Sequence, residues 1–207
     1  KARLAKTTVK YGTLLPKTPV LIYNNSRLHP QTYQGSQFSS SDLENLSITG
    51  GYLQRFKLRD STDSMAIVPD GYRGEKSGDF SYAGADYRWG KNIRLSYFYG
   101  ELENFYRQNF AGIQHDLPLG HGVLTSDLRY FNSVDSGSAY AGKIHNNMLS
   151  GLLSYALYGH TFGAGYQALN GEAGLPYISG ASVYSFSNAG ISKFIKQDEK
   201  TWMLNYS

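Results

Sequence analysis

Basic side chains recur at positions where a β-strand would point them toward one face of a sheet. From alternation alone, the candidates are Lys6, Lys10, Arg55, Arg94 and Arg129. A guanidinium binds a carboxylate through paired hydrogen bonds. A row of such sites, each of moderate affinity, lets an anion move from one site to the next without being held at any of them. The pattern predicts a path for small carboxylates. Each cation could instead be neutralised by a neighbour, which we expect for Arg129 because Asp127 shares its strand face.

Strands must position these side chains, because the surrounding segments alternate in polarity with period two. In Ile93–Tyr99, Leu95 and Tyr97 share one face while Arg94 projects from the other. An unpaired charge is too costly in a dry core, so the polar face must meet water. The sequence therefore predicts an all-β protein, an antiparallel transmembrane β-barrel around a wet lumen. The side chains expected to face lipid include Leu95, Tyr97, Leu128, Leu153 and Tyr155.

The composition agrees with a barrel. No segment approaches the roughly 18–20 apolar residues of a membrane helix, yet aromatic residues reach 14% and include 18 tyrosines, which membrane interfaces attract. A soluble β-sandwich is the alternative, but it would carry fewer inward charges. The absence of cysteine suits a protein that crosses an oxidising periplasm. The net charge of +4, without a lysine and arginine stripe, favours small anionic ligands and no nucleic acid.

Short and long connections alternate along the chain, which is typical of outer-membrane barrels with short periplasmic turns. The short turns are 88–92, 117–122 and 158–160, and the long links are 59–78, 101–108, 132–143 and 170–192. About nine or ten strands are expected. They are Arg3–Leu14, Leu46–Leu58, Asp79–Tyr87, Ile93–Glu101, Gln108–Leu117, Val123–Phe131, Asn146–Leu157, Thr161–Leu169 and one or two between Val183 and Tyr206.

Several segments match one protein family in order. The run Lys10–Pro16 followed by Pro19–Pro30 resembles the "GTLLP…PVLxYNDxRLLP" run of the OprD family of outer-membrane porins, and Leu58–Asp63 resembles its "LRDSTD" segment. Further family strands are matched by Ala83–Tyr87, Tyr97–Asn104 and Asp127–Phe131. The resemblance implies an eighteen-stranded channel in the outer membrane of Gram-negative bacteria that imports small carboxylate-bearing nutrients.

About half of such a barrel is present in 1–207, all of it within a single barrel domain. Because the chain stops in mid-alternation at Ser207, we expect strands beyond both ends. The implied partners are the lipid bilayer, lipopolysaccharide and small carboxylate substrates. The oligomeric state stays open between a monomer and a homotrimer.

The loop 15–35 has the composition of an inward-folding segment. Pro16, Pro19 and Pro30 stiffen it, and the apolar run 20–22 is too hydrophobic for a loop in water. We expect it to pack against the barrel wall and narrow the lumen; the alternative is a loop packed beneath other extracellular loops. Its polar tip would consist of Tyr23, Asn24, Asn25, Ser26 and Arg27.

The resemblance assigns roles around this loop. It makes the loop a constriction, gives Arg27 the position of the family's pore arginine, and places Arg59 on the opposite side of the eyelet. Arg59 also follows a strand from which Arg55 and Lys57 are expected to project together. Asn25 replaces the family's aspartate, so one negative charge is lost and anions are favoured.

A second inward loop is expected at 170–182, where the family has a loop opposing the first across the pore. Tyr177 and Ser179 could offer hydroxyls to a carboxylate, although Gly171, Gly174 and Gly180 could instead indicate flexibility alone.

The function predicted from these features is substrate-selective passive uptake of small carboxylates, with aromatic or aliphatic acids favoured, through an arginine-lined constriction. The alternatives are a non-selective diffusion porin or an outer-membrane serine hydrolase. The five histidines are scattered without metal-ligand spacing, and no GxSxG motif, P-loop or paired carboxylates in a cleft occur. We therefore expect no enzyme activity, no metal and no cofactor.

Overall fold

The computed structural model describes residues 1–186 and 193–207, and these residues form strands without helices. Twelve strands make one sheet in the order β1-β2-β5-β6-β8-β9-β10-β11-β12-β13-β14, with β7 paired to β6. Each pairing between the described strands of this sheet is antiparallel. The predicted all-β antiparallel fold is confirmed. No helix in the described residues is long and apolar enough to cross a membrane.

The elements have the following bounds. The main sheet contains β1 (Ala2–Leu4), β2 (Thr7–Leu14), β5 (Thr32–Ser40), β6 (Leu46–Lys57), β7 (Met65–Ala66), β8 (Phe80–Trp89), β9 (Ile93–Leu102), β10 (Tyr106–Leu119), β11 (Gly122–Asp135), β12 (His145–Leu157), β13 (His160–Gly171) and β14 (Lys200–Tyr206). A separate hairpin pairs β3 (Lys17–Thr18) with β4 (Leu21–Ile22).

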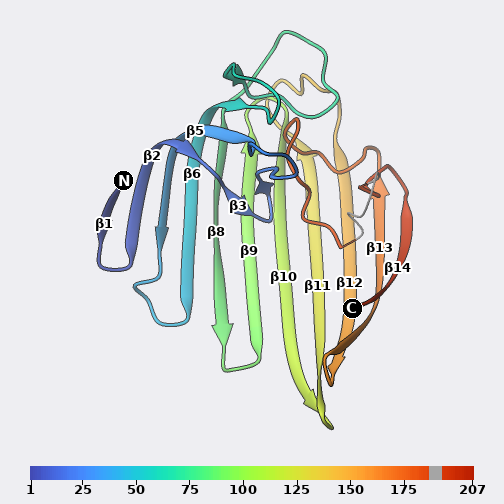
Figure 1. The fold of residues 1–207 in the computed structure, drawn as a ribbon. Helices are drawn as coiled ribbons and strands as arrows, with labels where there is room; N and C mark the ends of the chain where they lie inside the picture. Colours follow the sequence, from blue (N-terminus) through green and yellow to red (C-terminus); the bar gives the residue numbers. More distant parts are fainter. Residues whose placement is uncertain (187–192) are drawn as a thin grey trace.

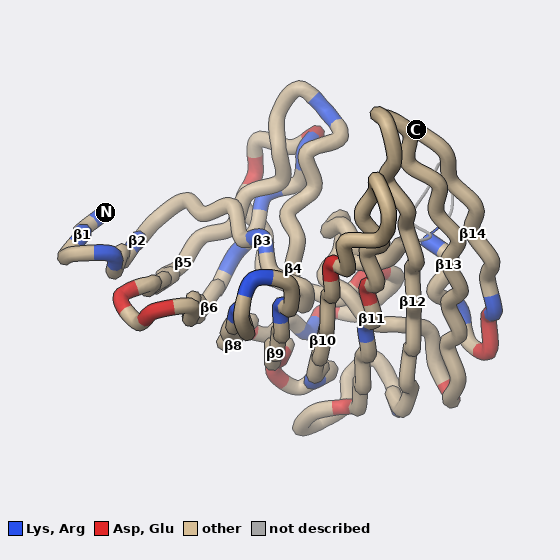
Figure 2. The backbone as a smooth tube through the Cα atoms, turned by 90° about the horizontal axis from the view of Figure 1, so that it is seen from below, with Lys and Arg blue, Asp and Glu red and all other residues tan. Residues whose placement is uncertain are grey.

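The sheet is curved, and its hairpins give it two different rims. Short turns join β8 to β9, β10 to β11 and β12 to β13 at the lower rim, whereas the long connections gather at the upper rim (Figure 1). Viewed from below, the strands follow an arc whose two ends, β1 and β14, lie apart (Figure 2). The predicted asymmetry between short turns and long loops is thus confirmed for these hairpins.

Most strand predictions are confirmed within a few residues, and the differences have local causes. The predicted strand Arg3–Leu14 is two strands, because the chain reverses at Ala5, whose φ is 50°. The strand β5 was missed, since its first residues were assigned to the loop 15–35. The predicted long link 101–108 is a tight turn in which Asn104 has φ 62°. Of the range between Val183 and Tyr206, β14 is found, and residues 187–192 lie outside the described residues.

The convex face carries the apolar side chains that the alternation predicts. Leu128 and Leu153 are 52% and 54% exposed, and Tyr97 is 55% exposed. Such exposure on a continuous face would be unfavourable in water but suits contact with lipid. This face is therefore assigned to the bilayer.

The concave face is divided, which the prediction of a uniformly polar inner face missed. Its upper half has one apolar row that runs across five neighbouring strands: Phe98, Phe110, Phe131, Met148 and Leu169. All five side chains are buried. The lower half carries the charged and polar side chains Asp86, Arg88, Arg94, Gln114, Asp127 and Arg129. Only the lower half is built to face water.

The lipid-facing assignment predicts the effect of a single charge. Replacing Leu128 or Leu153 by arginine should cost about 2–4 kcal/mol of folding free energy in a bilayer, because the guanidinium must be desolvated near the membrane midplane. Ser154→Arg is the matched control, since Ser154 neighbours Leu153 but points to the concave face. Denaturant titration in lipid vesicles measures the three costs. Equal stability of Leu153→Arg and Ser154→Arg would contradict the assignment of Leu153 to the lipid face, and a greater cost for Ser154→Arg would show that the faces are reversed.

Candidate functional site

Three long loops pack on the apolar half of the concave face. They are the first loop (15–31, with β3 and β4), the second loop (58–79, with β7) and the third loop, whose described residues are 172–186 and 193–199. Each contributes buried apolar side chains to the core, among them Val20, Leu21, Ile67, Leu175 and Ile178. The hairpin of the first loop lies in front of the middle strands instead of extending beyond them (Figure 1). Residues 32–35 of the predicted loop 15–35 belong to β5.

The first and third loops are directly joined. The Ser182 amide donates to the Ile22 carbonyl at 3.0 Å, and the Asn24 side chain donates to the Gly180 carbonyl at 3.0 Å. The expectation from the family was that these loops oppose each other across a pore. Instead they touch, and the tip of the first loop rests on the third.

The second loop completes the same layer. The Asp70 amide donates to the Tyr177 carbonyl at 2.9 Å, and the Ser179 amide donates to the Val68 carbonyl at 3.0 Å. Three segments far apart in the sequence therefore form one hydrogen-bonded layer.

The predicted tip residues divide into supporting and exposed positions. Tyr23 packs against the core, and its amide bonds the Pro16 carbonyl at 3.0 Å. Asn24 fastens the loop as described, whereas Asn25 is exposed. Arg27 is exposed, and Arg59 donates a hydrogen bond to the hydroxyl of the neighbouring Ser26. The structure thus brings Arg59 to the tip that carries Arg27.

A third basic group, Lys193, lies close to this tip. Its Nζ atom is 3.6 Å from the centre of the Tyr177 ring and 3.4 Å from the Ala181 carbonyl oxygen. The Tyr177 hydroxyl donates to the Asp70 carboxylate. In this arrangement the Tyr177 proton, which was expected to be offered to a substrate carboxylate, is donated to Asp70. Sequence reasoning missed Lys193, since nothing in its local pattern links it to Arg59.

The charges of this cluster perturb one another. Burial lowers the pKa of Lys193, and although Asp70 opposes this shift, the charge of Arg59 adds to it. Burial also raises the pKa of Tyr177, and the hydrogen bond to Asp70 adds to that shift. These residues form one cluster at the boundary of the loop layer, in which the charge of one side chain shifts the pKa of another. The cluster consists of Arg59, Asp70, Tyr177 and Lys193.

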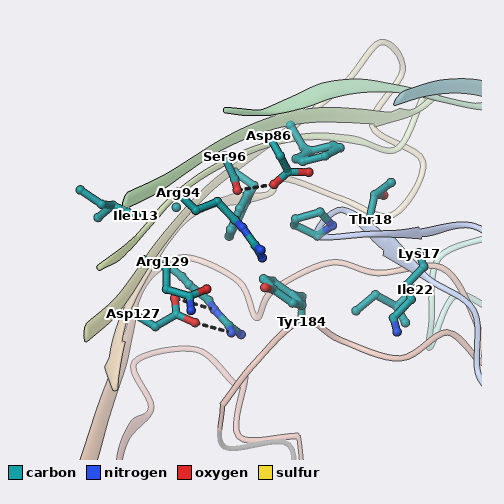
Figure 3. Close-up of a pocket in the computed structure, with 15 residues that line it drawn as sticks. Lys17, Thr18, Ile22, Asp86, Arg94, Ser96, Ile113, Asp127, Arg129 and Tyr184 are labelled. Carbon is teal, nitrogen blue, oxygen red and sulfur yellow. Dashed lines mark hydrogen bonds and ion pairs between the residues drawn. The ribbon is translucent and has the colours of Figure 1, made fainter. Parts of the chain in front are cut away.

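Below the loops, a cavity of about 240 Å³ opens between the first loop and the charged half of β8 to β11 (Figure 3). Lys17 and Thr18 line it from the loop, and Arg94 points into it from β9. Asp86, on β8, accepts a hydrogen bond from Ser96. Gln114, Asp127 and Arg129 also line the cavity, together with apolar side chains that include Ile22, Phe98, Phe110 and Tyr184.

Arg94 carries uncompensated charge. It lies directly opposite Arg88 in the β8–β9 pairing, and like charges in such a pair repel. In the described part of the chain, neither arginine has an acidic partner within 4 Å. Arg88 was overlooked, although the short turn between these strands could have paired it with Arg94 by counting register.

Arg129 is neutralised, as predicted. It donates to Asp127 through Nε at 3.2 Å and Nη2 at 2.8 Å. Its guanidinium also lies 3.9 Å from the ring centre of Tyr184 and 3.7 Å from that of Phe186. Arg129 therefore attaches the third loop to the wall by cation–π contacts.

The prediction that Arg55 projects from the same inward face as the other basic side chains is wrong. At Gln54 the register between β5 and β6 shifts by one residue, so that Gln34 pairs with Arg55 but Gly35 pairs with Leu53. Such a bulge exchanges the faces of all residues beyond it. Phe56 consequently points inward, 1% exposed, and Arg55 points away and bonds the Ser64 hydroxyl at 3.2 Å.

Glycine makes this bulge possible. A Cβ atom on Gly35 would lie 2.1 Å from the Tyr52 carbonyl oxygen, a contact that no larger residue could tolerate. Without the bulge, Arg55 and Lys57 would project inward as the alternation predicted.

The remaining predicted cations lie away from the loop layer. Lys10 is exposed on β2, where it pairs with Gln37 of β5, and Lys6 lies in the turn before β2, its amide donating to Asp42 at 2.7 Å. Ser179 contributes its backbone to the loop layer. Within residues 1–186 and 193–207, no group of three or more acidic, histidine or cysteine side chains could hold a metal ion.

Comparison with known proteins gives a consistent picture. The outer membrane porin family OprD matches residues 1–207. Among curated relatives, the porin-like protein GalP of Pseudomonas putida is 33% identical and Porin D of Pseudomonas aeruginosa is 31% identical, each across 100% of this chain. These alignments cover 51% and 49% of the relatives, so the chain spans about half of their length.

Solved structures agree. OccK8 (OprE) of Pseudomonas aeruginosa superposes with a TM-score of 0.94 at 36% identity, covering 99% of this chain and 58% of that one. OpdK of the same organism, solved with vanillate, superposes with a TM-score of 0.94 at 33% identity, covering 99% of this chain and 55% of that one.

The lowered pKa of Lys193 predicts a pH dependence. As pH rises toward 10.5, the ordinary lysine pKa, Lys193 should lose its proton before a free lysine does, and local positive charge should fall. Reversal potentials in a salt gradient should then show declining anion preference. Lys193→Arg should abolish this decline, because arginine stays charged throughout the range. If the wild type and Lys193→Arg lose anion preference in parallel, another group titrates.

Proposed function

Because the chain belongs to the OprD family of outer membrane porins, we propose that it forms part of a channel for selective passive uptake of small carboxylate-bearing solutes. The chain spans about half the length of its curated relatives, so the proposal concerns the wall and loops that this half contributes. Residues 1–207 would belong to one barrel domain in the outer membrane.

The uncompensated charge of Arg94 carries the proposal. Arg94 faces Arg88 and shares its cavity with Lys17, while the neighbouring Arg129 is paired with Asp127. A cation in a narrow wet passage raises the local concentration of anions and replaces part of their hydration shell. Arg94 is thus available to a substrate carboxylate, whereas Arg129 is committed to the protein.

The loop layer would form the constriction above this cavity. Positive charge there comes from Arg27 at the tip of the first loop, from Arg59, which bonds Ser26 of that tip from the second loop, and from Lys193. Tyr23 and Asn24 support the tip, so we assign them to shaping the passage. Asn25, which is exposed on the tip, would border the passage. Lys10, lower on the wall, would provide a peripheral positive charge.

The wall of the cavity favours acids with an apolar body. Phe98, Phe110 and Tyr184 border the same space that Arg94 enters. A planar ring could lie against these side chains while its carboxylate meets the guanidinium. The relative OpdK was solved with vanillate, an aromatic carboxylate, and we extend this substrate class to the present chain.

A non-selective diffusion porin is the main alternative, and it would share the same fold. The two differ in whether carboxylates compete with chloride for the passage. The relatives described above are porins, which favours a channel over the serine hydrolase alternative.

Arg94→Ala should weaken block of chloride current by benzoate about tenfold, the effect of losing one charge-assisted contact in a wet lumen. Arg94→Lys is the matched control: it should retain anion preference but bind benzoate less tightly, because an ammonium lacks the paired donors. Single-channel recording with increasing benzoate measures both effects. Block that is unchanged in Arg94→Ala, or absent in the wild type, would favour the non-selective porin.

A further inference from the structure

Five amide side chains hold the third loop by its backbone carbonyl groups. Two of the five come from the first loop and the others from the sheet. The hydrogen bonds are Asn146 to Ala173 (3.2 Å) and Gly174 (2.8 Å), Gln108 to Pro176 (3.3 Å), Gln31 to Ser179 (2.8 Å), Asn24 to Gly180 (3.0 Å) and Gln167 to Phe194 (2.6 Å).

Four of these amides are buried. Asn146 and Gln31 are 0% exposed, Gln167 is 2% and Gln108 is 3% exposed. A buried amide is costly unless its donors are bonded, so each bond is strongly favoured over an open alternative. The donors come from β10, β12, β13 and the first loop, and they contact the loop along much of its length.

The third loop has little regular structure of its own to fix its path. Between Gly171 and Lys200 no strand forms in the described residues, and Gly180 adopts a φ of 73°. Because the amides bind carbonyl groups, they determine where the backbone runs whatever side chains the loop carries. The same backbone positions Tyr177 beside Asp70 and Lys193.

We propose that Gln108 and Asn146 are positioning residues that keep the third loop stationary and so set the aperture of the passage. The proposal rests on the proposed function in one respect, that this loop borders the path of ions. Loss of the Gln108 donor would remove one hydrogen bond to a loop carbonyl, and loss of the Asn146 donor would remove two, which would allow the loop to leave the wall. Gln108 also bonds the Ser133 hydroxyl at 3.1 Å, which orients its amide toward Pro176.

The chemistry of the donor supplies a specific test. Gln108→Met nearly preserves volume but removes the donor at every pH. Gln108→Glu preserves shape, and its carboxyl group can donate to the Pro176 carbonyl only when protonated. The glutamate variant should therefore hold the loop at low pH and release it at high pH, whereas a purely steric role for Gln108 would give no such reversal.

The experiment is single-channel recording in potassium chloride with no carboxylate present. We expect Gln108→Met to show about tenfold greater occupancy of substates and excess current noise, the shift expected from one lost hydrogen bond to the loop. Asn146→Leu, which removes the bonds to both Ala173 and Gly174, should show at least as large a shift. Gln108→Glu should be noisy at alkaline pH and quiet at about pH 4. The matched control is Gln37→Met, on the concave side of β5, for which no bond to the third loop exists in the described residues.

Quiet, wild-type currents in Gln108→Met and Asn146→Leu would overturn the proposal, as would equal noise in Gln37→Met. If Gln108→Met does not insert, the comparison of Gln108→Glu at the two pH values decides alone. If Gln108 and Asn146 do not position the loop, benzoate should still block current through the wild-type channel. If the channel does not select carboxylates, the current noise can still be compared among the variants, because that recording contains no carboxylate. The two proposals can therefore fail independently.

Discussion

Burial of the apolar row on the upper concave face is the constraint on which the arrangement depends. Phe98, Phe110 and Phe131 face the interior of the arc, where a wet lumen would otherwise hydrate them. Exposed aromatic area is unfavourable in water, so the loops are drawn inward to cover it. Tyr184 of the third loop packs edge-on against Phe110 at 5.5 Å, which is one contact of this cover. The loop layer is thus a consequence of how apolar side chains are distributed on the sheet.

The same distribution decides where charge can remain. Below the covered row, Arg94 and Asp86 stay in contact with the cavity, because no apolar layer seals that half. Above it, Lys193 is partly buried beside Arg59, and its pKa falls as a result. The charged side chains that could bind a solute therefore lie at the borders of the loop layer, where the layer determines how much water reaches them.

Neighbouring arginines on one face differ in what they can bind. Arg129 has its donors occupied by Asp127 and its planar faces covered by Tyr184 and Phe186. Arg94, two strands away, lacks such partners among the described residues and points into the cavity. Sequence alternation alone predicts only that both side chains project from the same face of the sheet. The difference arises from the third loop, which Arg129 contacts.

Most of the strands, the alternation of their faces and the pairing of Arg129 with Asp127 could be predicted from the sequence, because they depend on period two and on residues close in the chain. The family could be recognised from motifs that occur in the same order along the chain. The remaining features depend on how distant segments pack. The bulge at Gln54 turned Arg55 outward, since register depends on how two strands pair. Segments far apart in the sequence also meet in the cluster of Arg59, Asp70 and Lys193. The same is true of the hydrogen bonds from Gln108 and Asn146 to the third loop. No local pattern encodes such contacts, because they exist only once the loops have folded onto the sheet.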